Sequence, residues 1–188
     1  MELPRTFGKY ELVQLLGEGG MASVYRAAMS GPGGFRKQVA LKLLKPEVSQ
    51  VDQMVELLFN EARLGGLLQH NNLVEVYEFD QADGQYYMAI EFVDGYTLSD
   101  VMARVPVGQG LPPKIVAKIG LQICQGLAYA HVAVDEQGRP MNLVHRDLKP
   151  ANVMIRRDGV IKIADFGIAK AATNLSQTQT GLTRGTPV

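Results

Sequence analysis

The sequence has one cysteine among its 188 residues, no tryptophan and no excess of charge of either sign. A single cysteine, Cys124, cannot close an internal disulfide or supply a cysteine-rich zinc site, and its apolar neighbours predict a small buried side chain. With 19 basic and 19 acidic residues, the composition gives no electrostatic case for nucleic-acid binding. No apolar run reaches the roughly 20 residues that a membrane-spanning helix needs, and the N-terminus lacks the layout of a signal peptide. We therefore expect a cytoplasmic chain without a membrane segment.

The residues that are present are sufficient for a folded domain, since 46% are hydrophobic and 20% are charged. Alternating and β-branched residues predict strands in the first half of the chain, with a glycine-rich turn after the first of them. Between positions 51 and 68, apolar residues recur at three- and four-residue spacing, which predicts one amphipathic helix among these strands. The five predicted strands cover residues 10–16, 23–29, 37–44, 73–79 and 85–92.

The second half of the chain is predicted to be mainly helical. A short helix is expected at 98–105 and a long one at 113–131, where a proline suits the first helical position. Two short strands, 152–155 and 160–166, flank a turn, and the residues from 171 onward are predicted to form a loop. Strands followed by helices indicate an α+β fold with two subdomains, and the cleft between them is the expected functional site.

Two features of the first half could serve phosphate binding. Gly17, Gly19 and Gly20 lie in the turn between two predicted strands, where the absence of Cβ atoms lets backbone N–H groups approach a phosphate. A glycine-rich hairpin is common, so this signal is weak by itself. Lys42 lies among aliphatic residues on a strand. It is either a surface side chain or a buried one paired with a carboxylate, for which Glu61 of the predicted helix is the candidate.

The segment HRDLKPAN, residues 145–152, carries several functional groups on what must be a loop, since its proline excludes a helix interior. Asp147 could act as a base, Lys149 could provide a charge for a phosphate, and Asn152 could act as an oxygen ligand. Asp165 follows an apolar strand in the segment ADFG. Oxygen donors of this kind suit Mg²⁺. Taken singly, each of these residues is also consistent with a polar surface turn.

Taken together and in this order, the motifs resemble the signature set of protein kinases, and the resemblance extends from Tyr10 to Pro187. The stretches GEGGMASVY, HRDLKPANVMI and DFGIAK are most similar to the bacterial, Hanks-type relatives of eukaryotic Ser/Thr protein kinases. The resemblance implies a two-lobe α+β fold. The N-lobe, residues 1–93, would have a five-stranded antiparallel sheet and one helix, and the C-lobe, residues 94–188, would be incomplete and mainly helical.

The resemblance also implies an activity, namely ATP-dependent phosphorylation of Ser/Thr residues on protein substrates in bacterial signalling, with Mg²⁺ as the metal. Lys42 would contact the α/β-phosphates and pair with Glu61. Asp147 would accept or orient the proton of the substrate hydroxyl, and Lys149 would steady the γ-phosphate. The implied metal ligands are Asn152 and Asp165. The residues implied to surround the nucleotide are Leu16, Gly17, Glu18, Gly19, Gly20, Val24, Ala40, Lys42, Glu91, Val93 and Met154.

The sequence departs from the family pattern at two positions. Ala22 replaces the third glycine of the glycine-rich loop, a mild change that we do not expect to prevent binding. Gly65 follows Glu61 by one helical turn, at a position where the family usually has a larger apolar residue. We therefore expect a loosely held helix and a poorly held contact between Glu61 and Lys42.

Two further expectations concern the later part of the chain. Arg146 implies regulation by autophosphorylation at Thr178 or Thr180, with a dimer as the arrangement for phosphorylation in trans. The chain stops before the helices that complete the larger lobe in this family, so the apolar face of the helix 113–131 is expected to be exposed. Three alternatives stay open for these 188 residues: an active kinase, a truncated nucleotide-binding or pseudokinase-like module with little or no catalysis, and a fragment that does not fold alone.

Overall fold

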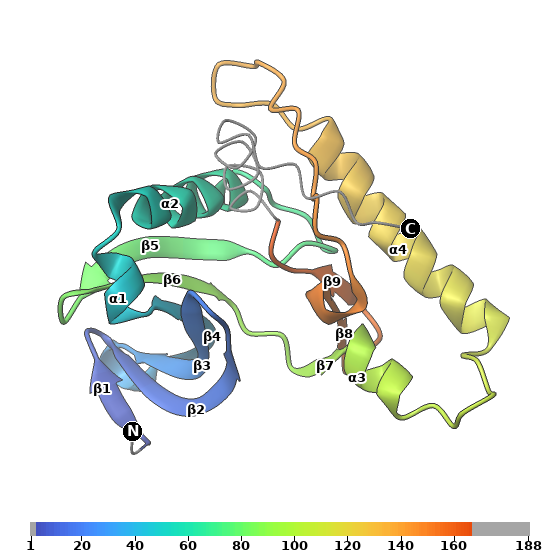
Figure 1. Ribbon diagram of the computed structural model, residues 1–188, viewed down its shortest axis with the longest axis horizontal. Helices are drawn as coiled ribbons and strands as arrows, with labels where there is room; N and C mark the ends of the chain where they lie inside the picture. The colour runs from blue at the N-terminus through green and yellow to red at the C-terminus, as the bar shows by residue number, and fades with distance from the viewer. Residues whose placement is uncertain (1–2, 167–188) are drawn as a thin grey trace, which may run out of the picture.

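In a computed structural model, which describes residues 3–166, the chain forms two antiparallel β-sheets with helices packed against them (Figure 1). The first half of the chain builds the larger, curled sheet and the second half builds the smaller one. Thr178 and Thr180, the expected phosphorylation sites, lie outside the described residues.

The larger sheet has six strands in the order β1-β2-β3-β4-β6-β5. They are β1 (Arg5–Phe7), β2 (Tyr10–Glu18), β3 (Ala22–Ser30), β4 (Arg36–Leu44), β5 (Val76–Ala82) and β6 (Gln85–Glu91). All five predicted strands are present, and β1 is an additional edge strand that the sequence did not predict. Three residues are too few to show an alternating pattern. The ring of Phe7 is nevertheless buried and packs edge-on against Tyr87, with 5.6 Å between ring centroids.

Successive side chains of a strand point to opposite faces of the sheet, and both faces of this sheet are buried in places. Leu43 and Tyr87 belong to a core on one face, whereas their neighbours Leu44 and Met88 belong to a core on the other. The second core is completed by the helix α2 (Asp52–Gly66), which follows the one-turn helix α1 (Pro46–Ser49). The strands that face both cores are therefore apolar on both sides, and this is why residues 39–44 are nearly all aliphatic.

The smaller sheet contains β7 (Gly95–Thr97), β8 (Val153–Arg156) and β9 (Ile161–Ile163) in that order. Between β7 and β8 the chain forms the helices α3 (Leu98–Ala103) and α4 (Pro113–His131). Thr97 and Asp100 form a reciprocal capping box that fixes the start of α3. Two short 3₁₀ helices complete the described elements, η1 (Pro32–Gly34) in the β3–β4 connection and η2 (Pro150–Asn152) just before β8.

Helix α4 lies along one edge of the molecule and contacts β9 (Figure 1). Its buried positions, Ile119, Gly126 and Ala130, are seven and four residues apart and form one narrow stripe. Cys124 lies away from this stripe and is exposed, so the expectation of a buried thiol is wrong. No helix in residues 3–166 has the length and apolar character needed to cross a bilayer.

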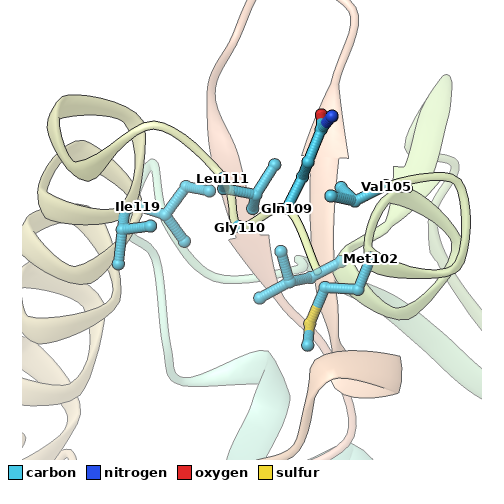
Figure 2. Close-up of a pocket in the computed structure, with 8 residues that line it drawn as sticks. Met102, Val105, Gln109, Gly110, Leu111 and Ile119 are labelled. Atoms are coloured by element: carbon cyan, nitrogen blue, oxygen red, sulfur yellow. The ribbon is translucent and has the colours of Figure 1, made fainter. Parts of the chain in front are cut away.

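Large apolar side chains are exposed on α4, as expected for the helix 113–131, and also on α3. Leu121 of α4 is 61% exposed and Met102 of α3 is 52% exposed. Between the two helices lies an open hollow of about 320 Å³. Figure 2 shows its walls, with Met102 and Val105 facing Leu111 and Ile119 across the hollow. This hollow shares no lining residue with the cleft described next.

Candidate functional site

A cleft of about 400 Å³ lies where the two sheets meet. Its upper wall comes from β2, β3 and β4, its rear wall from the end of β6 and the connection to β7, and its floor from the segment around β8. The predicted site residues that line the cleft are Leu16, Gly17, Val24, Ala40, Lys42, Glu91, Val93, Met154 and Asp165. Glu18, Gly19 and Gly20 belong to the same loop but do not line the cleft.

Several lining residues were not predicted from the sequence. They are Val74, Tyr96, Thr97, Asp100, Ala151 and Ala164. Ile90, Phe92, Asp94 and Gly95 also line the cleft, in the segment IEFVDG against which the resemblance implies that adenine lies. Ala151 and Ala164 adjoin the predicted residues Asn152 and Asp165 in the chain, which could have indicated them. Thr97 and Asp100 could have been found from the capping-box spacing in TLSD, which places a helix start at the mouth of the cleft. The Asp100 carboxylate accepts hydrogen bonds from the Thr97 backbone N–H and hydroxyl, and these hold the pKa of Asp100 below its usual range.

The glycine-rich loop joins β2 to β3 above the cleft. Gly19 donates its backbone N–H to the carbonyl of Ala22 at 2.9 Å, which closes the turn. A Cβ atom built on Gly17 or Gly20 would meet nothing within 4 Å. Packing would therefore tolerate a side chain at both positions. The open space beside their backbone would allow a ligand to approach it closely. The replacement of glycine by Ala22 causes no conflict, since its side chain is buried within β3.

Lys42 of β4 connects the two carboxylates nearest to it. Its Nζ lies 3.0 Å from Oε1 of Glu61, on α2, and 3.3 Å from Oδ1 of Asp165, which follows β9. Burial opposes the charged form of Lys42, but Asp165 and Glu61 outweigh it and raise the pKa of the ammonium. Burial also raises the pKa of Glu61, against the opposing effect of the Lys42 ammonium. The three side chains bring together β4, α2 and the end of β9.

The contact between Lys42 and Glu61 is formed, so the expectation that Gly65 loosens it is not met. A Cβ atom at Gly65 would lie 2.6 Å from Cγ2 of Val76, closer than real Cβ contacts come. The glycine therefore lets α2 approach β5 closely, and Val76 fills the space that a larger helical side chain would occupy. A small cavity of about 30 Å³ beside Glu61 remains between helix and sheet.

Asp147, Lys149 and Asn152 form one hydrogen-bonded group on the loop before β8. Lys149 Nζ lies 2.9 Å from Oδ2 of Asp147, and the Asn152 side-chain amide donates to the same oxygen at 3.3 Å and to the Asp147 carbonyl at 3.0 Å. Asn152 is buried, and η2 places it at the base of this loop. A lysine and an amide on one oxygen fix the orientation of the carboxylate, which a base that acts by positioning requires.

The loop is further held by the buried imidazole of His145. Its Nδ1 accepts the backbone N–H of Asp147 at 3.3 Å, so Nε2 carries the proton and donates to the carbonyl of Ala164 at 3.0 Å. Burial lowers the pKa of His145, which favours this neutral form. Its ring also packs against Phe166, with centroids 4.8 Å apart. His145 thus joins the loop of Asp147 to the segment that carries Asp165.

Arg146 and Asp165 adopt left-handed backbone conformations, with φ of 58° and 52°. Such angles are uncommon for residues other than glycine and tend to occur where the surrounding structure enforces them, often at functional sites. Each is adjacent to a residue of the network just described: Arg146 lies between His145 and Asp147, and Asp165 follows Ala164.

The residues expected to hold Mg²⁺ have the appropriate donor chemistry. Asp165 offers a half-exposed carboxylate at the wall of the cleft, and Asn152 uses its amide N–H groups on Asp147, which leaves its side-chain oxygen as the potential ligand. Mg²⁺ usually takes one or two protein ligands together with waters and substrate phosphates. Consistently, residues 3–166 contain no group of three or more His, Cys, Asp or Glu side chains arranged for an all-protein metal site.

A family model described as the protein kinase domain matches residues 10–187. The chain is 36% identical over 184 residues to tyrosine-protein kinase MasK of Myxococcus xanthus, covering 97% of this chain and 28% of that protein. It is 37% identical over 180 residues to serine/threonine-protein kinase PknH of Mycobacterium tuberculosis, covering 96% of this chain and 26% of that protein. For serine/threonine-protein kinase PrkC of Bacillus subtilis, the identity is 34% over 182 residues, covering 96% of this chain and 26% of that protein. The chain spans about a quarter of the length of these relatives.

Solved structures agree with this assignment. The kinase domain of PknI from Mycobacterium tuberculosis is 32% identical, with a TM-score of 0.66 over 89% of this chain and 62% of that one. The structure titled PpkA-294 apo form, at 22% identity, has the same fold with a TM-score of 0.72 over 95% of this chain and 66% of that one. The family model matches most of the chain, and the solved kinase domain shares its fold of two sheets with a cleft between them. The chain therefore belongs to the protein kinase family.

Proposed function

We propose that this domain binds Mg·ATP in the cleft and transfers the γ-phosphoryl group to Ser or Thr hydroxyls of protein substrates. The observation that carries the proposal is the arrangement of two charged groups, of which the first reaches the cleft through Lys42 and Asp165. Lys42, Glu61 and Asp165 form one of them, and Asp147, Lys149 and Asn152 form the other. His145 connects the segments that carry the two groups through its bonds to Asp147 and Ala164.

Each group suits one part of phosphoryl transfer. The substrate hydroxyl oxygen forms a bond to the γ-phosphorus while the bond from that phosphorus to the β–γ bridging oxygen breaks, and the hydroxyl proton passes to Asp147. Lys149, 2.9 Å from Asp147, provides a positive charge beside the transferred group. Lys42 would contact the α/β-phosphates, since Glu61 already holds its ammonium at the cleft wall. Mg²⁺, bound through Asn152 and Asp165, would neutralise the phosphate charge. Most of the catalytic effect is then positioning and electrostatic stabilisation.

The adenine would lie against the end of β6. Glu91 and Val93 would offer backbone hydrogen bonds there, while Val24, Ala40 and Met154 enclose the ring; all five residues line the cleft. An apolar slot with a few backbone donors and acceptors is the usual form of such a site.

The Ser/Thr specificity rests on Lys149, two residues after Asp147, which is the form found in Ser/Thr kinases. The relatives differ on this point, since MasK is named a tyrosine-protein kinase whereas PknH and PrkC are named serine/threonine-protein kinases. We also propose that Thr178 or Thr180 is autophosphorylated, in trans within a dimer, and that the domain works in the cytoplasm.

The test is the intact mass of the 188-residue chain after incubation with Mg·ATP, beside the variant Asp147→Asn. We expect the wild type to gain phosphate and the variant to gain none. Digestion and phosphoamino-acid analysis should then give phosphothreonine at position 178 or 180. Phosphotyrosine alone would contradict the Ser/Thr specificity, and phosphate found only elsewhere in the chain would contradict the proposed sites.

The alternative is a nucleotide-binding module with little or no catalysis. It predicts no mass gain but an increase in melting temperature with Mg·ATP, because a ligand at 100 times its dissociation constant stabilises by about 2.7 kcal/mol. Lys42→Met should reduce that increase. A chain that shows no cooperative melt would overturn both alternatives for these 188 residues.

A further inference from the structure

Lys45 makes two contacts with the glycine-rich loop. It is the first residue after β4 and lies three residues beyond Lys42. Its side-chain Nζ lies 2.9 Å from Oε1 of Glu18, which ends β2. Its backbone N–H donates to the carbonyl of Met21 at 3.0 Å, on the other side of the loop tip. One residue therefore holds both arms of the loop.

The backbone of Lys45 is itself held firmly. Its carbonyl accepts the backbone N–H groups of Val48 and Ser49, each at 2.9 Å, in the single turn of α1. Val48 packs against the core that Leu44 and Leu58 form between the sheet and α2. Lys45 is thus fixed to the packed part of the N-lobe, and its contacts connect the glycine-rich loop to that part.

The charge of Glu18 gives the ion pair a second consequence. The carboxylate lies between Gly17 and Gly19, in the loop proposed to cover the phosphates. Charges interact over a Debye length of about 8 Å at physiological ionic strength, so an uncompensated carboxylate at this point would repel a bound polyphosphate. Lys45 supplies the compensating charge. Lys42 and Lys149 already lie beside carboxylates of their own.

We propose that Lys45 is a positioning residue that anchors the glycine-rich loop and neutralises Glu18, and that it thereby strengthens binding of the nucleotide phosphates. This inference rests on the proposed nucleotide-binding function. The effect is modest in size, because Lys45 is 30% exposed and Glu18 is 59% exposed, and exposed ion pairs contribute little. The expected loss on breaking the pair is about two- to fivefold in affinity.

The test compares Lys45→Met, Glu18→Gln and the double variant for binding of Mg·ATP and of adenosine, which has no phosphates. We expect Lys45→Met to weaken Mg·ATP about two- to fivefold and to leave adenosine unchanged. Glu18→Gln added to Lys45→Met should restore the affinity for Mg·ATP, since no carboxylate then remains unpaired. Arg36→Met is the matched control: it breaks a cross-strand pair with Glu11 on the same sheet, remote from the cleft residues, and should change neither affinity.

Two binding results would overturn the inference. An equal loss for adenosine would mean that Lys45→Met damages the whole cleft. A double variant as weak as Lys45→Met would mean that the unpaired charge of Glu18 is not what weakens Mg·ATP binding. Amide hydrogen exchange of residues 17–22 without ligand separates this inference from the proposed function. If the wild type binds neither ligand, the proposed function fails. Faster exchange in Lys45→Met would still support the anchoring of the loop by Lys45, and unchanged exchange would overturn that anchoring.

Discussion

The ion pair between Lys162 and Glu91 is the most deeply buried one among the described residues, and its removal gives a prediction of definite size. Lys162 of β9 has a side chain that is 9% exposed, and its Nζ lies 2.7 Å from Oε2 of Glu91, at the end of β6, whose side chain is 16% exposed. The same ammonium donates to the carbonyl of Leu73 at 3.1 Å. The pair joins the smaller sheet to the larger one at the point where the chain passes between the lobes.

Lys162→Met would leave the Glu91 carboxylate buried without its counter-charge. Removing one partner of a buried pair costs about 3–5 kcal/mol. Because Glu91 retains some exposure, we take the lower end, about 3 kcal/mol, which corresponds to a decrease of about 6–12 °C in melting temperature for a chain of this size. The measurement is thermal unfolding followed by circular dichroism. A decrease of less than about 2 °C, the size expected of a surface substitution, would refute the reasoning.

Two controls identify the cause of that decrease. Arg157→Gln breaks a pair with Asp94 in which both side chains are about two-thirds exposed, and it should change the melting temperature by no more than about 2 °C. Combining Lys162→Met with Glu91→Leu should recover most of the loss, since replacing both members of a buried pair by apolar residues is often neutral. The Leu73 carbonyl lacks its donor in both variants. A double variant no more stable than the single one would therefore show that the loss came from this carbonyl rather than from the unpaired charge.

Two further predictions concern packing and protonation. Gly65→Ala should destabilise the chain by about 1–3 kcal/mol and weaken Mg·ATP binding, since its Cβ would meet Val76 at 2.6 Å. Gly66→Ala, whose Cβ meets nothing within 4 Å, should instead stabilise α2 by up to about 1 kcal/mol. Equal effects of the two variants in urea unfolding would contradict the argument that Gly65 allows close approach of α2 to β5. Burial lowers the pKa of His145, so the unfolded chain binds its proton more readily and the free energy of unfolding should decrease as the pH falls below about 6.5; an NMR titration in which the His145 ring protonates above that pH would refute the sign.

Much of the fold follows from periodicity in the sequence. The apolar spacing in residues 51–68 predicts α2, and the structure places it at Asp52–Gly66. The limits of α4 are the predicted ones, because Pro113 marks its first turn. Alternation and turn residues likewise locate the five longer strands. These signals are local, since each depends on neighbours within a few positions along the chain.

The motifs also indicated which residues would meet, although they lie far apart in the chain. Lys42 also contacts Asp165, 123 positions away, and this contact was not expected. Lys42 and Glu61 are 19 positions apart, and their side chains are in direct contact. No periodicity could predict this contact; it came from the resemblance to a family. Residues without a motif were missed for the same reason. Lys162 looks like an ordinary polar position of a short strand, and only the packing of β9 against Leu73 and Glu91 makes it a buried charge.

The wrong expectations arose where burial depends on a neighbouring element. Gly65 appeared to weaken α2 because a glycine removes a side chain from the helix. In the structure the missing side chain is what permits close contact with Val76, so the same residue tightens the packing. Cys124 appeared buried because Ile123 and Leu127 lie near it in the sequence, but successive residues of a helix are about 100° apart, and this turns Cys124 away from the buried stripe of Ile119, Gly126 and Ala130.

The geometry around Asp165 indicates which contact of Lys42 would remain when a metal ion is bound. Its carboxylate is 3.3 Å from Lys42, the longer of the two contacts that the ammonium makes, and it is also the proposed metal ligand. Lys42 contacts only Oδ1 of Asp165, so a cation held by Asp165 would either use the other carboxylate oxygen or compete with the ammonium for Oδ1. In both cases Lys42 would keep Glu61, at 3.0 Å. The buried glutamate would then hold the ammonium at the cleft wall and leave its remaining donors for the phosphates. Glu61 is therefore the residue whose removal should misplace Lys42 even when metal and nucleotide are both present.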